Sequence, residues 1–134
     1  MQLHPRLEED CHQLGFIGTS ALLLHRNASM PWFILVPNTS IGALYQMPAL
    51  ARVVVEEEWN TLSAWVHKRF ECTRVNMAAI GNLVPQLHLH IVGRHEGDPC
   101  WPGVVWGQEL PESQWQQSVI DGLVGELGAE CGLR

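Results

Sequence analysis

A strict alternation of polar and apolar residues over residues 86–92 constrains this chain more than any other feature. The segment is Gln-Leu-His-Leu-His-Ile-Val, with polar side chains at positions 86, 88 and 90. A period of two predicts a β-strand with one face in a core. Gln86, His88 and His90 would then project from the other face, about 7 Å apart at each step.

The two histidines of this predicted strand are candidates for chemistry rather than for packing. Histidine titrates near neutral pH, and two imidazoles side by side on an apolar strand have two functional uses. They could bind a metal ion, or one could attack an electrophile while the other assists. A purely structural role, in which each imidazole only makes hydrogen bonds, is the alternative.

A metal site would need a third and usually a fourth ligand. None of the other histidines repeats the His-x-His spacing, and the four cysteines form no Cys-x-x-Cys pair. A two-histidine site completed by a distant carboxylate stays open, but the nucleophile hypothesis fits better. We therefore expect neither a metal ion nor another cofactor.

The rest of the chain predicts an α+β fold. Residues 20–25 and 33–36 are predicted strands that could form a hairpin, and residues 74–79 form a third. A helix is predicted from Pro48 to about Phe70, because proline suits a first helical turn. A last helix is predicted over 112–127, with a core stripe of Trp115, Val119, Leu123 and Leu127. This order, with short links, indicates an antiparallel sheet with two main helices.

Length and composition limit the possible classes of protein. The chain has 134 residues, 46% of them hydrophobic and 16% charged, so we expect one folded domain over residues 1–134 with its core at about 20–106. The net charge of −6 argues against a broad nucleic-acid interface. It leaves room for a nucleotide held by backbone N–H groups. Without a signal-like or membrane-spanning apolar run, and with dispersed cysteines, we expect a cytoplasmic protein that binds no membrane.

The motif and its flanks resemble the histidine triad (HIT) family, whose motif is His-φ-His-φ-His-φ-φ with φ apolar. His88 and His90 match the second and third histidines, and Gln86 replaces the first. Asn76, Gly81 and Asn82 lie where HIT proteins carry an Asn and a Gly-Gln pair. The segments 32–37 and 100–103 resemble the strand and the Trp-Pro-Pro-Gly tail of the nucleotide-binding branch. The resemblance covers about residues 20–106. Within the family, the chain is similar to bacterial HIT-domain and diadenosine polyphosphate hydrolase-like proteins.

This resemblance implies a nucleotidyl hydrolase or transferase in a homodimer with a continuous sheet. His88 would attack the α-phosphorus of a dinucleoside polyphosphate or nucleoside phosphoramidate, and the phosphohistidine would be hydrolysed by water. His90 would donate to a phosphoryl or leaving-group oxygen. Gln86 would orient His88. The implied nucleotide-binding residues are Asn27, with His25 and Arg26 as alternatives for the ribose, and Asn76, Gly81, Asn82 and Trp101.

Three positions depart from the family pattern. Glutamine at 86 can donate and accept hydrogen bonds but cannot shuttle a proton near pH 7. Leu83 stands where many relatives place Ser or Thr against the phosphate, and Trp32 stands where His is common. A catalytically weak nucleotide-binding protein is therefore a second hypothesis, and a metal-dependent hydrolase is a third.

Overall fold

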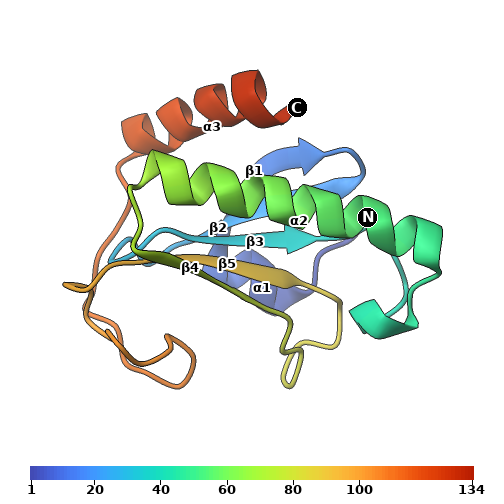
Figure 1. Cartoon of the computed structure of the whole chain (residues 1–134), viewed down its shortest axis with the longest axis horizontal. Helices are drawn as coiled ribbons and strands as arrows, with labels where there is room; N and C mark the ends of the chain where they lie inside the picture. Colours follow the sequence, from blue (N-terminus) through green and yellow to red (C-terminus); the bar gives the residue numbers. More distant parts are fainter.

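The computed structural model describes all 134 residues and forms one five-stranded sheet with helices on both sides (Figure 1). The elements are α1 (Pro5–Asp10), β1 (Cys11–Ile17), β2 (Ser20–His25), β3 (Trp32–Val36), the short 3-10 helix η1 (Leu44–Gln46), α2 (Ala49–Arg69), β4 (Arg74–Ala78), β5 (Leu89–Arg94) and α3 (Gln117–Cys131). The α+β fold class expected from the sequence is confirmed, with a third, short helix in addition to the two main ones.

The sheet has the order β1-β2-β3-β5-β4, and every neighbouring pair is antiparallel. β2 and β3 form the expected hairpin, with Ala21 opposite Val36 and Leu24 opposite Phe33. β5 lies between β3 and β4, so the strand with the histidines is in the interior of the sheet. β1 and β4 are the two edges.

Both faces of the sheet are covered, which explains why β2 and β3 are apolar throughout. Leu22, Leu24, Phe33 and other alternate residues pack on one face against α2 and α3, which lie together in Figure 1. Ala21 and Leu23 point to the opposite face, where Leu7 of α1 and Val105 of a later loop cover them. Apolar runs of this kind are typical of strands buried on two sides.

The strand predicted over 86–92 is shifted in the structure to Leu89–Arg94. Leu89 pairs with Leu35 and His90 pairs with Ala78, and both of those neighbouring strands end within two residues of these positions. In this register, position 88 faces Val36, the last residue of β3, so residues 86 and 87 lie beyond the ends of both neighbouring strands. The predicted orientation of the apolar side chains is confirmed, because Leu87, Leu89 and Ile91 belong to the larger core cluster.

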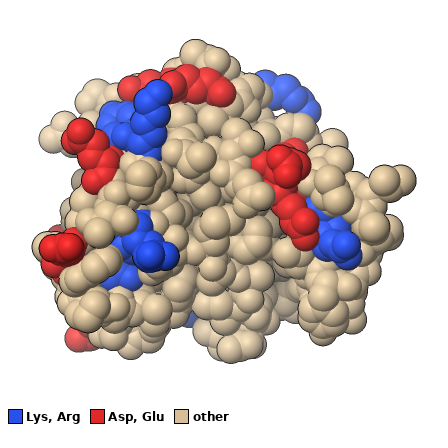
Figure 2. All heavy atoms as spheres, in the orientation of Figure 1, with Lys and Arg blue, Asp and Glu red and all other residues tan.

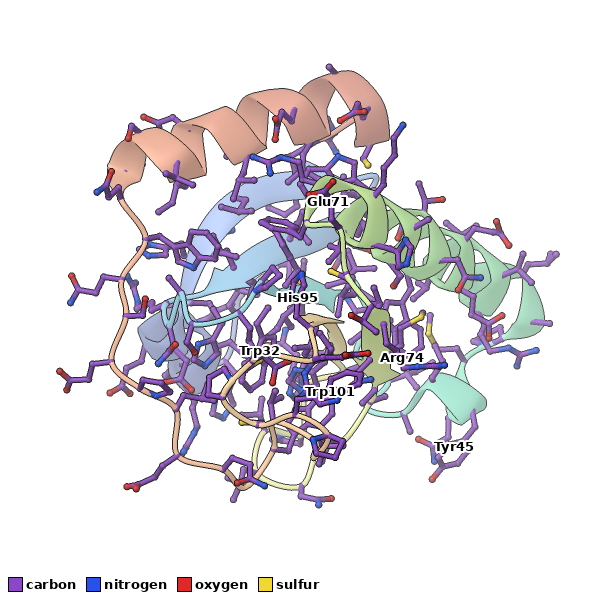
Figure 3. All side chains as sticks on the ribbon, turned by 60° about the vertical axis from the view of Figure 1, so that its left-hand side comes forward. Trp32, Tyr45, Glu71, Arg74, His95 and Trp101 are labelled. Carbon is purple, nitrogen blue, oxygen red and sulfur yellow. The ribbon has the colours of Figure 1, made fainter.

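The helix from Pro48 is confirmed as α2, with Pro48 as its N-cap residue. Its second half packs into the core through Leu62, Trp65 and Val66, whereas Leu50 in the first turn is 88% exposed. The exposed surface also includes Tyr45 of η1, which projects at the periphery in Figure 3. Apolar side chains around the start of α2 are thus exposed to solvent in the single chain.

The last helix begins five residues later than predicted, at Gln117, and ends at Cys131 before Gly132 in a left-handed conformation (φ 71°). Residues 111–116 are instead tied to the sheet: Gln114 forms a bridge with Asn27, and Trp115 Nε1–H donates to the carbonyl of His25 (3.0 Å). The expected core stripe is partly wrong, since Val119 is 40% exposed and Ile120 takes its place beside Leu123 and Leu127.

The charged side chains form small mixed groups around a largely uncharged middle on the face shown in Figure 2. Several of the pairs are exposed, such as Arg69 with Glu126 (2.7 Å) and Arg52 with Glu56 (3.3 Å). Pairs of this kind contribute little to stability. No helix is long and apolar enough to cross a membrane.

Candidate active site

A pocket of about 680 Å³ opens on the face of the sheet opposite α2 and α3. Its floor is formed by β2, β3 and the start of β5, and its walls come from α1, the loop at 80–84 and the segment 105–110. Both motif histidines line it, together with Asn27, Gly81 and Asn82. The sequence-predicted histidine pair therefore lies in a pocket of the size that small-molecule ligands occupy.

His88 is held by a hydrogen bond from its Nδ1 to the backbone carbonyl of Gln86, at 2.7 Å. A carbonyl oxygen only accepts, so the ring proton lies on Nδ1 and the lone pair on Nε2. Nε2 makes no hydrogen bond within the chain and is not sealed from the pocket. His88 thus directs Nε2, the nitrogen that bears the lone pair in this tautomer, at the pocket.

His90 lies beside His88, with ring centroids 5.0 Å apart. Its Nδ1 accepts a hydrogen bond from Trp32 Nε1–H (3.0 Å), and its backbone carbonyl accepts one from Trp59 Nε1–H of α2 (3.1 Å). Burial, together with the neighbouring His88 and His25, lowers the pKa of His90 to about 4. His90 is therefore uncharged at neutral pH and can act as a hydrogen-bond donor but not as a cationic acid.

The side chain of Gln86 does not lie in the pocket but holds the N-terminal segment. Its Oε1 accepts from the backbone N–H of His4 (2.8 Å), and its Nε2 donates to the carbonyl of Gln2 (3.1 Å). The sequence placed Gln86 on one strand face with the histidines, and the structure corrects this because residues 86–88 lie outside the strand ladder. The hydrogen bond that Gln86 makes to His88 therefore comes from its backbone carbonyl, not from its side chain.

The five predicted nucleotide-binding residues are only partly brought together. Asn27, Gly81 and Asn82 line the pocket, and Asn76 and Trp101 do not. Asn27 already uses both polar atoms of its side chain, since Nδ2–H donates to the Pro111 carbonyl and Oδ1 accepts from the Ser29 N–H. Asn76 Oδ1 instead accepts from Arg94 (2.8 Å).

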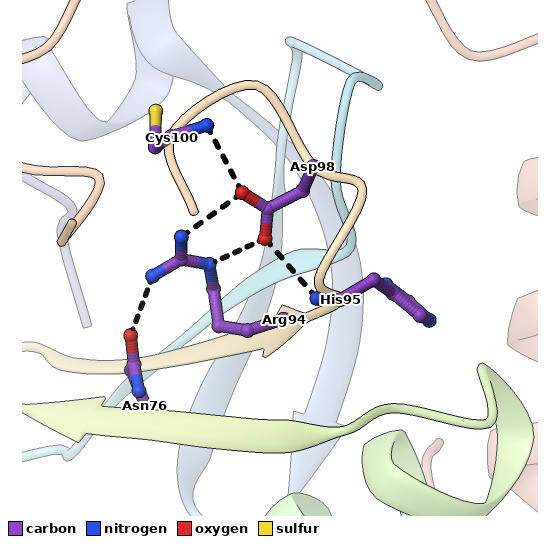
Figure 4. Close-up of polar contacts among 5 residues, drawn as sticks. All are labelled: Asn76, Arg94, His95, Asp98 and Cys100. Carbon is purple, nitrogen blue, oxygen red and sulfur yellow. Dashed lines mark hydrogen bonds and ion pairs between the residues drawn. The ribbon is translucent and has the colours of Figure 1, made fainter. Parts of the chain in front are cut away.

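Arg94 forms a buried ion pair that fixes the loop after β5 (Figure 4). Its Nε and Nη2 donate to the two carboxylate oxygens of Asp98 at 2.7 and 3.0 Å. Asp98 also accepts from the backbone N–H groups of His95 and Cys100. Trp101 follows directly, with its ring 5.8 Å from the guanidinium carbon of Arg94. Within one chain, Trp101 therefore packs on this ion pair and not on the pocket.

The pocket also contains residues that the sequence did not single out. Trp106 packs edge-on against His90, with ring centroids 5.3 Å apart. Arg6 and Asp10 of α1, as well as Cys11, line the wall that the N-terminal segment forms. Burial, and secondarily Asp10, raises the pKa of the Cys11 thiol to about 12, so this cysteine stays protonated and is no nucleophile.

No three His, Cys, Asp or Glu side chains come together to hold a metal ion. The carboxylate that would complete a two-histidine metal site is thus not placed beside His88 and His90.

The fold and this histidine pair define a HIT-type protein, and comparisons agree. The HIT domain family model matches residues 6–97. A crystal structure of a histidine triad protein from Marinobacter aquaeolei VT8 is 37% identical, with a TM-score of 0.89, over 98% of this chain and 96% of that one. A histidine triad protein from Sinorhizobium meliloti 1021 is 32% identical, with a TM-score of 0.89, over 96% of both chains.

A third structure, a histidine triad protein from Bradyrhizobium japonicum, is 31% identical, with a TM-score of 0.89, over 97% of both chains. The chain belongs to the HIT family. A comparison with curated proteins found no similar sequence.

Proposed function

We propose that this protein is a nucleotidyl hydrolase or transferase that attacks the α-phosphate of a nucleotidyl substrate through His88. The observation that carries the proposal is the bond from His88 Nδ1–H to the Gln86 carbonyl, which leaves the Nε2 lone pair facing the pocket. A nucleophile of this kind needs a fixed tautomer and an open nitrogen. Membership of the HIT family supports the same reaction class.

In the first step, Nε2 of His88 forms a bond to the α-phosphorus, and the bond from phosphorus to the leaving oxygen or nitrogen breaks. The leaving group departs with the bonding electron pair. The imidazole gains positive charge as this bond forms, and the Gln86 carbonyl stabilises it because a hydrogen bond from a cationic N–H is stronger than one from a neutral N–H. This carbonyl is therefore complementary to the transition state.

In the second step, water attacks the same phosphorus and breaks the P–N bond, which returns the electron pair to His88 Nε2. His90 lies beside the reacting nitrogen and supplies a hydrogen bond to a phosphoryl or leaving-group oxygen. A donor positioned in this way typically contributes about 10²–10⁴-fold to a rate. The N–H groups around Gly81 and Asn82 would bind phosphate, since Leu83 offers no hydroxyl there and is 76% exposed.

The test is a turnover screen of dinucleoside polyphosphates and nucleoside phosphoramidates. We expect His88→Ala to abolish turnover while the fold, checked by the thermal midpoint, is retained. His67→Ala is the matched control, because His67 is an exposed histidine of α2 away from the pocket. Near-normal rates in His88→Ala would contradict the assignment. Nucleotide binding without any turnover in the unmodified protein would favour the catalytically weak alternative.

We also propose that the protein forms a homodimer. β4 is an edge strand, so its outer N–H and C=O groups have no partner in the chain. The start of α2 exposes Leu50, Val53 and Val54, at 88, 50 and 59%, and Met77 of β4 is 39% exposed. A two-fold pairing would cover this apolar surface and extend the sheet.

A further inference from the structure

Trp32 of β3 is the residue that directly contacts the buried nitrogen of His90. The bond from Trp32 Nε1–H to His90 Nδ1 is 3.0 Å long, and the two side chains come from neighbouring antiparallel strands. The Trp32 residue is 8% exposed and His90 is 7% exposed. The indole stacks on the ring of His25 at 4.4 Å with 15° between the planes, so its direction is fixed from the other side as well.

The chemistry of indole decides how the proton of His90 is placed. An indole N–H donates a hydrogen bond and has no lone pair to accept one. His90 Nδ1 must therefore supply its lone pair, and the single proton of the neutral ring lies on Nε2. The other tautomer would set two N–H groups against each other in a buried contact, leaving both unsatisfied.

We propose that Trp32 is a positioning residue that holds His90 in the Nε2–H tautomer, so that His90 presents a fixed hydrogen-bond donor to the substrate's phosphoryl or leaving-group oxygen. His90 Nε2 makes no hydrogen bond within the chain and is reachable from the pocket. The identity of that substrate rests on the proposed function, whereas the tautomer itself does not.

Two adjacent imidazoles then carry opposite tautomers. The Gln86 carbonyl fixes His88 with its lone pair on Nε2, and the Trp32 indole fixes His90 with its proton on Nε2. One ring is thus a nucleophile and the other a donor, and neither needs to change its protonation for its role. A histidine at position 32 could take a proton from His90, but the indole of Trp32 has no lone pair to accept one. Trp32 therefore prevents proton transfer through position 32.

The surroundings of His90 also favour the neutral ring. The titratable and charged groups that share its pocket are His88, His25, Arg6, Asp10 and Cys11. Burial comes first among the causes that lower the pKa of His90, followed by His88 and His25. The indole bond adds to these, because a donor to Nδ1 stabilises the unprotonated nitrogen.

The test is the nitrogen chemical shifts of the histidine rings, measured by multiple-bond ¹H–¹⁵N correlation on ¹⁵N-labelled full-length protein without substrate at pH 7. The unmodified protein should show His90 with a protonated Nε2 and a bare Nδ1. In Trp32→Phe, which keeps an aromatic ring on His25 but loses the donor, His90 should become a mixture of tautomers. The pKa of His90 should also rise in this variant, so that the ring takes up a proton at a higher pH than in the unmodified protein.

Trp106→Phe is the matched control, because Trp106 packs on His90 without a hydrogen bond and its replacement should leave the tautomer unchanged. An Nδ1–H or cationic His90 at pH 7 in the unmodified protein would overturn the proposal, even if Trp32→Phe failed to fold. An unchanged tautomer and titration in Trp32→Phe would overturn it too.

A kinetic measurement tests the role of the tautomer. With a substrate found by the turnover screen, Trp32→Phe should lower kcat by about 2- to 10-fold, the effect of one hydrogen bond, with a smaller change in KM. An altered tautomer with an unchanged kcat would refute the positioning role. Absence of turnover in the unmodified protein would refute the proposed function, while the spectra alone would still decide the tautomer.

Discussion

Replacing Asp98 with asparagine tests the buried ion pair that anchors the loop leading to the pocket wall. The substitution keeps the shape of the side chain but removes its charge, leaving the Arg94 guanidinium buried without a counter-ion. The side chains of Arg94 and Asp98 are 2% and 4% exposed, so water cannot replace the lost partner. We expect Asp98→Asn to lower the free energy of unfolding at pH 7 by about 3 kcal/mol.

The pKa of Asp98 gives a second, independent route to this magnitude. Burial raises the pKa, but hydrogen bonds from Arg94, His95 and Cys100 outweigh it and bring the value to about 2, from a usual value of 3.8. A shift of this size corresponds to roughly 2–3 kcal/mol in favour of the folded state. Because the folded-state pKa is depressed, this stability is complete above pH ~4 and is lost as the pH falls through about 2.

Urea denaturation of both proteins at pH 7 and at several values down to pH 2 provides the measurement. In a separate thermal melt at pH 7, the midpoint of Asp98→Asn should fall by about 10 °C for a chain of this length. The difference from the unmodified protein should narrow between about pH 4 and pH 2. Asp121→Asn is the control, an exposed carboxylate of α3 whose loss should change stability by less than about 0.5 kcal/mol.

Two results would refute this reasoning. One is an Asp98→Asn variant within about 1 kcal/mol of the unmodified protein at pH 7, which would mean that the pair contributes no more than an exposed one. The other is a stability difference that is the same at pH 7 and pH 2, which would mean that the charge of Asp98 is not responsible.

Three further predictions concern the first motif position, the last helix and the assembly. Gln86→His should change turnover less than loss of either histidine does, because residue 86 is hydrogen-bonded to His88 through its backbone carbonyl; a collapse like that of His88→Ala would reveal a role not identified for Gln86. Leu123→Ala, at a fully buried position, should cost about 2–5 kcal/mol in urea denaturation, whereas the half-exposed Val119→Ala should cost less than about 1. Sedimentation should give a dimeric mass, and Trp101→Ala should weaken substrate binding more than folding, because the tail around Trp101 would approach the partner's site in the proposed dimer; a monomer with Trp101→Ala kinetically silent would refute both.

Much of the sheet could be predicted because its strands have strong local signals. The strand over 20–25 has the same bounds in the structure, since a short apolar run ends there at polar turn residues. β1 was not predicted because a bulge between Gln13 and Gly15 interrupts its alternation. α1 is only six residues long, too short for a helical period to be visible.

The site was predicted where one segment carries the information and missed where distant segments meet. His88 and His90 lie only two residues apart, so they are neighbours although only His90 belongs to β5. The burial of Arg94 depends on Asn76 and Asp98, and an arginine at a strand end usually reaches solvent. The contact of Gln86 with residues 2 and 4 spans more than 80 positions in sequence, and no local pattern indicates it.

The central claim is that His88 becomes covalently bonded to phosphorus during turnover. Rapid quench in base of the unmodified protein with a turned-over substrate, followed by intact-mass and peptide analysis under alkaline conditions, tests this directly, because base preserves a P–N bond that acid would hydrolyse. We expect a nucleotidyl adduct on the peptide containing His88, on Nε2, that disappears once the substrate is exhausted and is absent in His88→Ala. Turnover without any adduct, or an adduct on another residue that persists in His88→Ala, would contradict the account.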